Sequence, residues 1–283
     1  MSGWAALMIA GLLAGSAPDA AAQGSASSPT LSSQWPPASA CRFEIVGTGT
    51  VRSILDGRTF ALDDGREVRL AAVEAPSLPR PDDTGAKAVT AAAKSALEAL
   101  LGGQFVQLRQ SAPAIDRYGR ILAHVHFTRD GIERSAGHEM LAQGYARVGA
   151  HVGNAACAAE LLSRERAARA ARLGLWASPY YGIVEAASGA ELLASRGRFT
   201  VVEGKVLSVR ESGGTIYMNF GRRWSEALTV TILKRQERIF TEAGLPPKTL
   251  QNRRVRVRGW VDERNGPRIE ASHPEQIEIA ELN

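Results

Sequence analysis

The chain opens its ordered pattern near Gly49, where short runs of apolar and polar residues alternate between tight-turn signals. Turns are expected at Asp56-Gly57 and at Asp63-Asp64-Gly65. An Ala-rich stretch with helical spacing then ends at Gly102-Gly103, a typical helix stop. The pattern predicts strands over 50–55, 58–62, 67–73, 105–109 and 120–127, and helices over 87–101, 139–143 and 155–173.

A second block repeats this order after a short linking helix expected at 186–194. Its predicted strands cover 199–209, 215–220, 228–233, 254–261 and 268–271, with a helix over 234–243. Three strands, a helix and two strands are the order that a five-stranded OB barrel requires. We therefore expect a mainly β fold with helices (α+β), in which an OB-fold barrel with packed helices precedes a second OB-like barrel.

The N-terminus has the composition of an export signal. An apolar stretch of about ten residues, too short to span a bilayer, is followed by Ala20-Ala21-Ala22. We interpret 1–22 as a signal peptide and the Ser-, Pro- and Ala-rich 23–40 as a disordered tether. Because the segment before the apolar stretch has no Lys or Arg, an uncleaved anchor or a misassigned start remain alternatives. The expected domains are then 41–180 and 199–283, joined by a linker at 181–198, in a periplasmic or secreted protein with no membrane span in its mature part.

The net charge of the chain does not distinguish between the possible kinds of partner. The formal net charge is +5, and the part beyond Ala22 has +6, because the first 22 residues contain one acid and no basic residue. A mild basic surplus permits attraction to a polyanion. An Arg-rich solvated surface accounts for it equally well.

Only two cysteines occur, Cys41 and Cys157. An even pair in an exported protein indicates a disulfide more simply than a metal site or a nucleophile. Two buried free thiols are the alternative.

Three motifs, in this order and spacing, carry a resemblance to a known family. They are Leu55-Asp56-Gly57-Arg58-Thr59-Phe60, Val68-Arg69-Leu70-Ala71-Ala72-Val73-Glu74-Ala75-Pro76 and Asp116-Arg117-Tyr118-Gly119-Arg120-Ile121-Leu122-Ala123. Together with a terminal Gly174-Leu175-Trp176, they resemble the staphylococcal nuclease (thermonuclease) family over about residues 50–176. The resemblance implies an OB-type barrel and hydrolysis of phosphodiesters with a calcium ion, two phosphate-binding arginines and a glutamate that activates water.

By position, Arg69 and Arg120 match the two phosphate-binding arginines of the family. Planar guanidinium groups suit this role because they bind phosphate oxygens in a bidentate way and stabilise added charge. The alternative is that both arginines simply pair with local acids such as Glu74 and Asp116.

The metal and base positions are substituted. Arg58 stands where the family has an aspartate ligand, Glu74 replaces a second aspartate, and Ser77 replaces the glutamate base. A single carboxylate is a poor calcium cage, and an Arg58–Glu74 salt bridge would occupy it. We therefore expect no cofactor, with Ca²⁺ as the ion only if the family site is partly functional.

The second block contains its own candidate binding surface. Arg254, Arg256 and Arg258 alternate with valines on one strand, and aromatic residues are available nearby at Tyr217, Phe220, Trp224 and Trp260. OB barrels with a basic face and aromatics bind single strands or oligosaccharides. An exposed charged face opposite a valine core accounts for the same pattern.

Two function classes follow. The first is an exported thermonuclease-family protein that acts on or binds nucleic-acid phosphodiesters, with metal-dependent hydrolysis weakened or lost. The second is a non-catalytic periplasmic binding or structural protein whose two barrels take polymer or protein partners, such as an envelope protein or a glycan.

Overall fold

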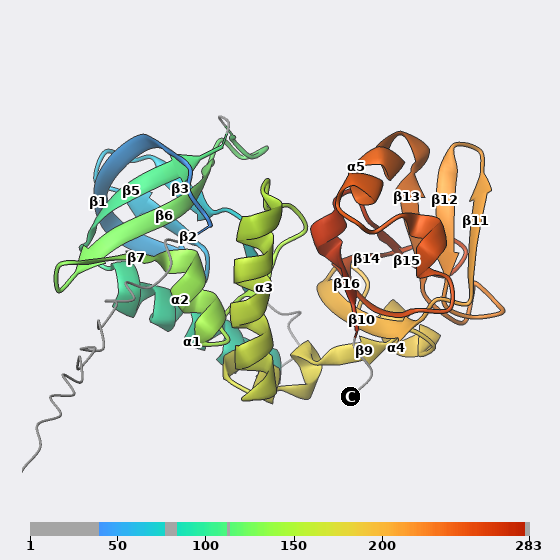
Figure 1. Cartoon of the computed structure of the whole chain (residues 1–283). Helices are drawn as coiled ribbons and strands as arrows, with labels where there is room; N and C mark the ends of the chain where they lie inside the picture. Colours follow the sequence, from blue (N-terminus) through green and yellow to red (C-terminus); the bar gives the residue numbers. More distant parts are fainter. Residues whose placement is uncertain (1–39, 77–83, 112–113, 281–283) are drawn as a thin grey trace, which may run out of the picture. The chain divides into compact units, whose positions relative to one another are not determined.

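A computed structural model describes residues 40–76, 84–111 and 114–280, and Ser39–Asn283 form one compact unit (Figure 1). The predicted signal peptide, nearly all of the predicted tether and Ser77 lie outside the described residues. Within the described part of the chain, no helix has both the length and the apolar character that a membrane crossing requires.

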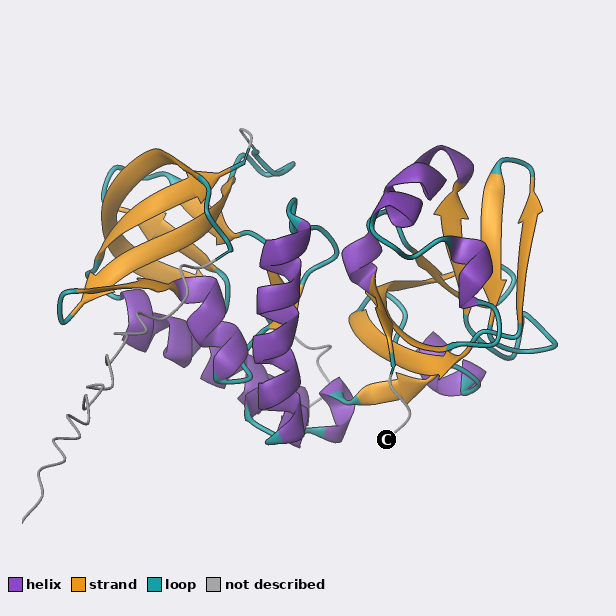
Figure 2. Cartoon of the chain, viewed as in Figure 1, coloured by secondary structure: helices purple, strands orange, loops and turns teal. Residues whose placement is uncertain are grey.

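The first half contains a closed barrel of five strands. Its strands follow the order β3-β2-β1-β5-β6, and a parallel β3–β6 pairing closes the ring (Figure 2). Their bounds are Glu44–Asp56 (β1), Thr59–Leu62 (β2), Glu67–Leu70 (β3), Phe105–Gln110 (β5) and Ile121–Arg129 (β6). A further strand, β7 (Ile132–Ser135), extends the sheet beyond β6. The OB-type barrel expected from the order of elements is confirmed.

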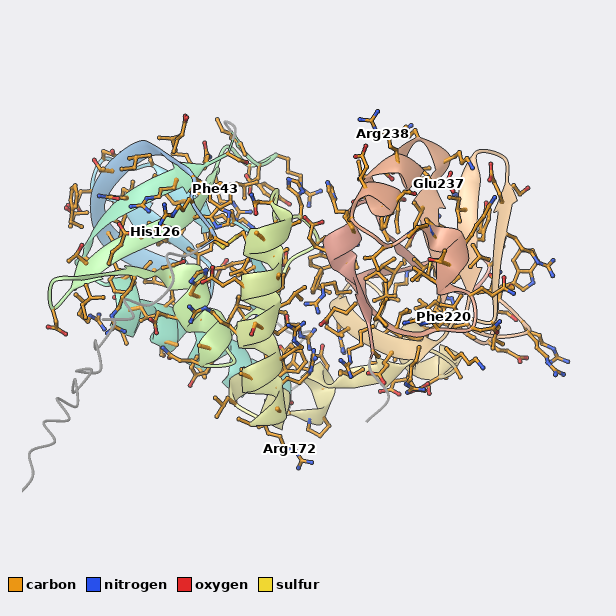
Figure 3. All side chains as sticks on the ribbon, viewed as in Figure 1. Phe43, His126, Arg172, Phe220, Glu237 and Arg238 are labelled. Atoms are coloured by element: carbon orange, nitrogen blue, oxygen red, sulfur yellow. A yellow bond between two sulfur atoms is a disulfide. The ribbon has the colours of Figure 1, made fainter. Side chains whose placement is uncertain are left out.

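Helices cover one end of this barrel (Figure 1). They are α1 (Thr84–Leu101), α2 (Ala136–Ala142) and α3 (Ala155–Ala170). In α1, Ala93, Leu97, Leu100 and Leu101 are buried in the barrel core, at the spacing of one helical face. Helix α3 ends earlier than predicted, because Arg172 takes a positive φ of 53°, and its side chain points away from the fold (Figure 3).

A disulfide joins Cys41, just before β1, to Cys157 in the first turn of α3. The Cα atoms are 4.5 Å apart and the two residues are separated by 116 positions. Asn154 caps this helix, since its side chain accepts a hydrogen bond from the backbone N–H of Cys157 at 2.9 Å. The predicted disulfide is confirmed, and the alternative of two free thiols is excluded for this structure.

The single strand predicted over 67–73 is divided in two. Ala72 has a positive φ of 61°, which breaks the extended conformation between β3 and a short strand β4 (Val73–Glu74). Strand β4 leaves the barrel and pairs with β8 (Arg147–Val148), which the sequence pattern did not predict. Glu74 is therefore held by a pairing outside the barrel.

The second half contains another sheet, in the order β11-β12-β13-β15-β14-β10-β9. Its strands are β9 (Ile183–Glu185), β10 (Phe199–Lys205), β11 (Ser208–Ser212), β12 (Thr215–Asn219), β13 (Thr229–Leu233), β14 (Arg254–Glu263) and β15 (Pro267–Glu270), with β16 (Ile277–Ile279) beside β14. Only two residues separate β10 from β11, and β13 pairs with β15 in parallel. This strand order parallels that of the first barrel and is consistent with the expected OB-like topology.

The segment expected as a linker contributes to the second core. Strand β9 pairs in parallel with β10, and Val184, Ala186 and Leu192 are buried among its apolar side chains. Leu192 lies in the short helix α4 (Gly189–Ala194), while the other helix of this half is α5 (Glu237–Glu242). These apolar residues of 183–194 are therefore part of the second core and not of a solvent-exposed linker.

Candidate phosphate-binding site

Four strands of the first barrel bring its candidate site residues together. Asp56 ends β1, Arg58 lies in the turn before β2, and Arg69 stands in β3 opposite Thr59 of β2. Arg120 immediately precedes β6, which runs parallel to β3 with Val68 opposite Ile121. The antiparallel and parallel pairings of one sheet thus gather residues that are up to 64 positions apart between Asp56 and Arg120.

Arg58 and Glu74 form the ion pair that the sequence indicated. The Nη1 of Arg58 donates to Oε2 of Glu74 and, at 3.4 Å, to the carbonyl oxygen of Val73. Arg58 is only 7% exposed, and its backbone N–H donates to Oδ1 of Asp56 at 2.8 Å. The carboxylate of Glu74 is therefore neutralised by a buried guanidinium.

The donor set does not fit a calcium ion. Calcium binds six to eight oxygen ligands, several of them carboxylate oxygens. At the two ligand positions that the family resemblance predicts, Arg58 is a cation and the carboxylate of Glu74 is its ion-pair partner. A dication near Arg58 would also be repelled by its fixed positive charge.

Arg120 is held by a compact turn. Its Nε donates to Oδ2 of Asp116 at 2.8 Å, its backbone N–H donates to Oδ1 of the same carboxylate, and the guanidinium lies 5.0 Å from the ring centre of Tyr118. The turn requires Gly119, whose φ is +81°. The alternative that Arg120 pairs with Asp116 is thus realised, and this pair also orients the arginine.

Arg69 is in a different situation. Its backbone belongs to strand β3, but among the described residues its guanidinium group makes no hydrogen bond or ion pair. Burial and the neighbouring positive charge of Arg120 lower the pKa of Arg69, and the carboxylates of Asp56 and Asp116 only partly oppose this shift. The guanidinium groups of Arg69 and Arg120 are close enough to repel each other, and that of Arg69 has no ion-pair partner among the described residues. Both features favour the binding of an anion between them.

Asp56 is the site residue that sequence reasoning missed. Burial raises the pKa of Asp56, although the positive charges of Arg69 and Arg120 oppose the shift. Asp56 precedes Gly57, and Asp-Gly is a common turn sequence. The sequence pattern therefore indicated a turn at Asp56 and no catalytic or binding role. It is a carboxylate beside the two arginines, in a position to accept a proton from a polar group bound there.

Within residues 40–76, 84–111 and 114–280, one group of side chains has metal-ligand types close together: Cys41, His138 and Glu160, whose ligand atoms lie within 4.8 Å of one another. Because Cys41 is bonded to Cys157, its sulfur is no thiolate ligand in this structure.

The basic face predicted on β14 is not an open binding surface. Arg258 is fully buried, donating to Oε2 of Glu165 in α3 at 2.7 Å and at 2.5 Å to Oε1 of Glu278 in β16. Arg254 and Arg256 both pair with Glu203 of β10, at 2.7 and 2.5 Å. The strand alternation was correct, but acidic residues from neighbouring elements neutralise this face.

The comparison with known families agrees with the barrel geometry. Residues 67–178 match the family model described as Staphylococcal nuclease homologue. This match begins at β3 and covers Arg69, Glu74 and Arg120, but not the second sheet. No curated protein is similar enough in sequence to the chain to count as a match. The closed five-stranded barrel and the matched residues show that the first half of the chain contains an SNase-like domain, a fold suited to nucleic-acid binding.

Proposed function

We propose that this protein is exported and binds nucleic acid through its SNase-like domain. Arg69 and Arg120 bind the phosphodiester groups, and calcium-dependent hydrolysis of these groups is weak or lost. The observation that carries the proposal is the pair of adjacent arginines, of which Arg69 has no partner among the described residues. A phosphate would relieve their mutual repulsion and satisfy both guanidinium forks.

The loss of metal-dependent hydrolysis is proposed from the Arg58–Glu74 ion pair. Without a bound cation, the phosphate is not polarised and the developing charge is stabilised by arginines alone. The family base position is Ser77 in this sequence, and loss of general-base action costs on the order of 10²–10⁴ in rate. Asp56 is the remaining carboxylate near the arginines, so any residual hydrolysis would depend on it.

The test combines cleavage and binding with the full chain. Purified protein is incubated with labelled single-stranded DNA, RNA and duplex DNA in calcium, magnesium, manganese or chelator, and binding is followed by fluorescence anisotropy in chelator. We expect binding without calcium-stimulated cleavage. Arg69→Ala with Arg120→Ala should weaken binding by this domain by roughly tenfold for each arginine, since a hydrogen bond to a charged group contributes about 1.5–3 kcal/mol.

Arg66→Ala is the matched control, because Arg66 lies on the turn before β3 and pairs with Asp64 at an exposed position. It should leave affinity unchanged. Strong calcium-dependent cleavage by the unmodified chain, abolished by Arg69→Ala, would contradict the proposed loss of hydrolysis. A chain that binds no nucleic acid at low salt would instead favour the envelope-protein or glycan alternative.

A gain-of-function variant separates the effect of the metal positions from the effect of the arginine geometry. Arg58→Asp with Ser77→Glu restores the acidic residue types of the family at these positions. We expect calorimetry to detect calcium binding and the cleavage assay to detect calcium-stimulated activity in this variant only. If the variant binds calcium yet remains inactive, the arginine geometry, and not the metal position, limits the reaction.

Export is proposed from the apolar N-terminal segment and from the disulfide, which persists in oxidising compartments. Cell fractionation with N-terminal sequencing of the mature protein tests it directly. A mature chain beginning near Gln23 in the periplasm or medium is the expected result. Full-length protein in the cytosol, with two reactive thiols after denaturation, would refute export.

A further inference from the structure

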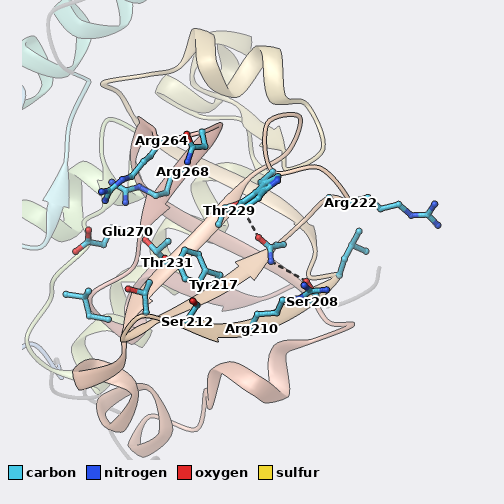
Figure 4. A pocket seen from close by; sticks show the side chains of 17 residues that line it. Ser208, Arg210, Ser212, Tyr217, Arg222, Thr229, Thr231, Arg264, Arg268 and Glu270 are labelled. Atoms are coloured by element: carbon cyan, nitrogen blue, oxygen red, sulfur yellow. Dashed lines mark hydrogen bonds between the residues drawn. The ribbon is translucent and has the colours of Figure 1, made fainter.

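A groove of about 960 Å³ lies on one face of the second sheet, and none of its lining residues belongs to the first barrel (Figure 4). Its floor comes from strands β11, β12, β13 and β15, which are adjacent in the sheet. The register places Arg210 opposite Tyr217, Tyr217 opposite Thr231, and Thr231 opposite Glu270, so these side chains form one row across the four strands. Figure 4 shows Tyr217 near the middle of this row.

Strand alternation explains why this face is polar. Ile216 and Met218 of β12, Val230 and Ile232 of β13, and Ile269 of β15 are buried in the second core. Residues between them point to the opposite face. That face carries hydroxyl and amide groups, and two hydrogen bonds of 3.3 Å join Asn219 to Ser208 and to Thr229 (Figure 4). The groove floor is thus a rigid polar platform on a packed core.

The charge of the groove is strongly one-sided. Its lining includes four arginines, Arg210, Arg222, Arg264 and Arg268, and one acid, Glu270. Among the described residues, the guanidinium groups of Arg210, Arg222 and Arg264 make no ion pair or hydrogen bond, and all three residues are exposed. The fourth arginine, Arg268, pairs with Oδ2 of Asp262 at 2.8 Å.

This arrangement contrasts with the face of β14, where Glu203 neutralises Arg254 and Arg256. This half of the chain therefore has one row of neutralised arginines on β14 and, around the groove, three arginines that have no acidic partner in the described part of the chain. Three arginines that line one groove without a balancing carboxylate among the described residues favour a polyanion as its ligand.

Aromatic side chains accompany these arginines. Tyr217 is half-buried in the centre of the floor, and Trp224, in the segment between β12 and β13, is 66% exposed. A large exposed indole beside cationic side chains offers a flat stacking surface. Bases stack on such surfaces in single strands, whereas bases in a duplex are covered by their neighbours. Arg210 lies opposite Tyr217 in the sheet, and Arg222 and Trp224 line the same groove, so groups that suit phosphates and groups that suit bases occur together.

We propose that this groove is a second binding site, which takes single-stranded nucleic acid. Arg210, Arg222 and Arg264 contact phosphates, and Tyr217 and Trp224 stack against bases. Hydroxyls that line the groove, such as that of the exposed Ser212, donate to or accept from base edges and sugars. The site does not depend on the arginine pair of the first barrel, so a chain could retain one activity after losing the other.

The experiment uses the full chain carrying Arg69→Ala and Arg120→Ala, so that binding to the first barrel is removed. Fluorescently labelled oligo(dT) and oligo(A) of 20 nucleotides serve as probes, at about 50 mM salt and upward. Arg210→Ser with Arg264→Ser should weaken binding by at least about tenfold and reduce the salt slope by about 1.4, because each phosphate contact to a single strand contributes about 0.7. Trp224→Ala should weaken binding by roughly fivefold or more, as expected for the loss of one stacked base.

Arg235→Ser with Arg238→Ser is the matched control. It removes the same charge from exposed positions outside the groove, at η3 (Lys234–Gln236) and in α5. It should change affinity by less than about twofold, since distant exposed charges are largely screened by salt. Equal weakening by the control and the groove variants would overturn the proposal, because binding would then reflect net charge alone.

Two other results would also overturn it. The first is that the chain with Arg69→Ala and Arg120→Ala binds neither probe at low salt. Binding by the first barrel is then tested separately, with the unmodified chain. The second is binding of heparin that depends on Arg210 and Arg264 but not on Trp224, with no measurable binding of oligo(dT); this would assign the groove to a sulfated glycan.

Discussion

Removal of the Cys41–Cys157 disulfide should strongly reduce the stability of the fold. The bond closes a loop of 116 residues that contains all strands of the first barrel and helices α1 and α2. In the chain-entropy model, closing a loop of this length lowers the entropy of the unfolded chain by about 16 cal/mol/K, which corresponds to roughly 5 kcal/mol at 25 °C. For a unit of this size, such a change lowers Tm by about 10–20 °C.

The assay is guanidinium unfolding and a thermal scan of unmodified protein and of the double variant Cys41→Ala, Cys157→Ala, each with and without a dithiol reductant. Both cysteines are buried, so alanine fits the site better than serine, whose hydroxyl would need a partner. The unmodified protein should lose stability on reduction, and the variant should not respond to the reductant. A loss below about 1 kcal/mol in both comparisons would refute the loop-closure argument.

Further predictions concern buried charge, pH and metal. Arg258→Ala leaves the carboxylates of Glu165 and Glu278 buried without their cation and should cost about 3–5 kcal/mol in denaturant unfolding; a change within about 0.5 kcal/mol would contradict this. Burial lowers the pKa of His124 to about 4, so the folded state binds fewer protons than the unfolded state between pH 6.5 and about 4. The contribution of His124 to stability is therefore full above pH 6.5 and falls by about 1.4 kcal/mol per pH unit down to about pH 4; His124→Gln should flatten this part of the stability curve, and an unchanged curve would exclude His124 as the cause. Calorimetry should detect no tight calcium binding to the unmodified chain, whereas Arg58→Asp alone should produce weak binding; tight binding without any substitution would show that the Arg58 ion pair is no barrier.

Local pattern was sufficient for most elements of the first barrel. Alternation and turn residues located β1, β2, β5 and β6, and the apolar spacing together with Gly102 located the end of α1 at Leu101. Such signals are local, because each depends on side-chain direction or on backbone conformations that only a few residues adopt. Strands β4 and β8, each of two residues, are too short to carry any period, so no sequence pattern could reveal them.

The candidate site was predictable where it depended on residue identity. The exchange of a carboxylate for Arg58, with Glu74 as its partner, could be inferred from the motif alone, because opposite charges at neighbouring ligand positions will pair. The role of Asp56 could not, since its proximity to Arg69 and Arg120 arises from the pairing of β2 with β3 and of β3 with β6. Register between distant strands is a property of the closed barrel.

The sequence by itself determined the two blocks of strands and the cysteine pair, because each follows from residue type and local period. Only the tertiary structure decided which charges are available to a ligand. Period 2 assigns Arg254, Arg256 and Arg258 to one face of β14, but it does not specify what covers that face. There, Glu165, Glu203 and Glu278 from other elements neutralise the arginines. The groove arginines at 210, 222 and 264, in contrast, come from a strand and two loops, line one groove and have no acidic partners among the described residues.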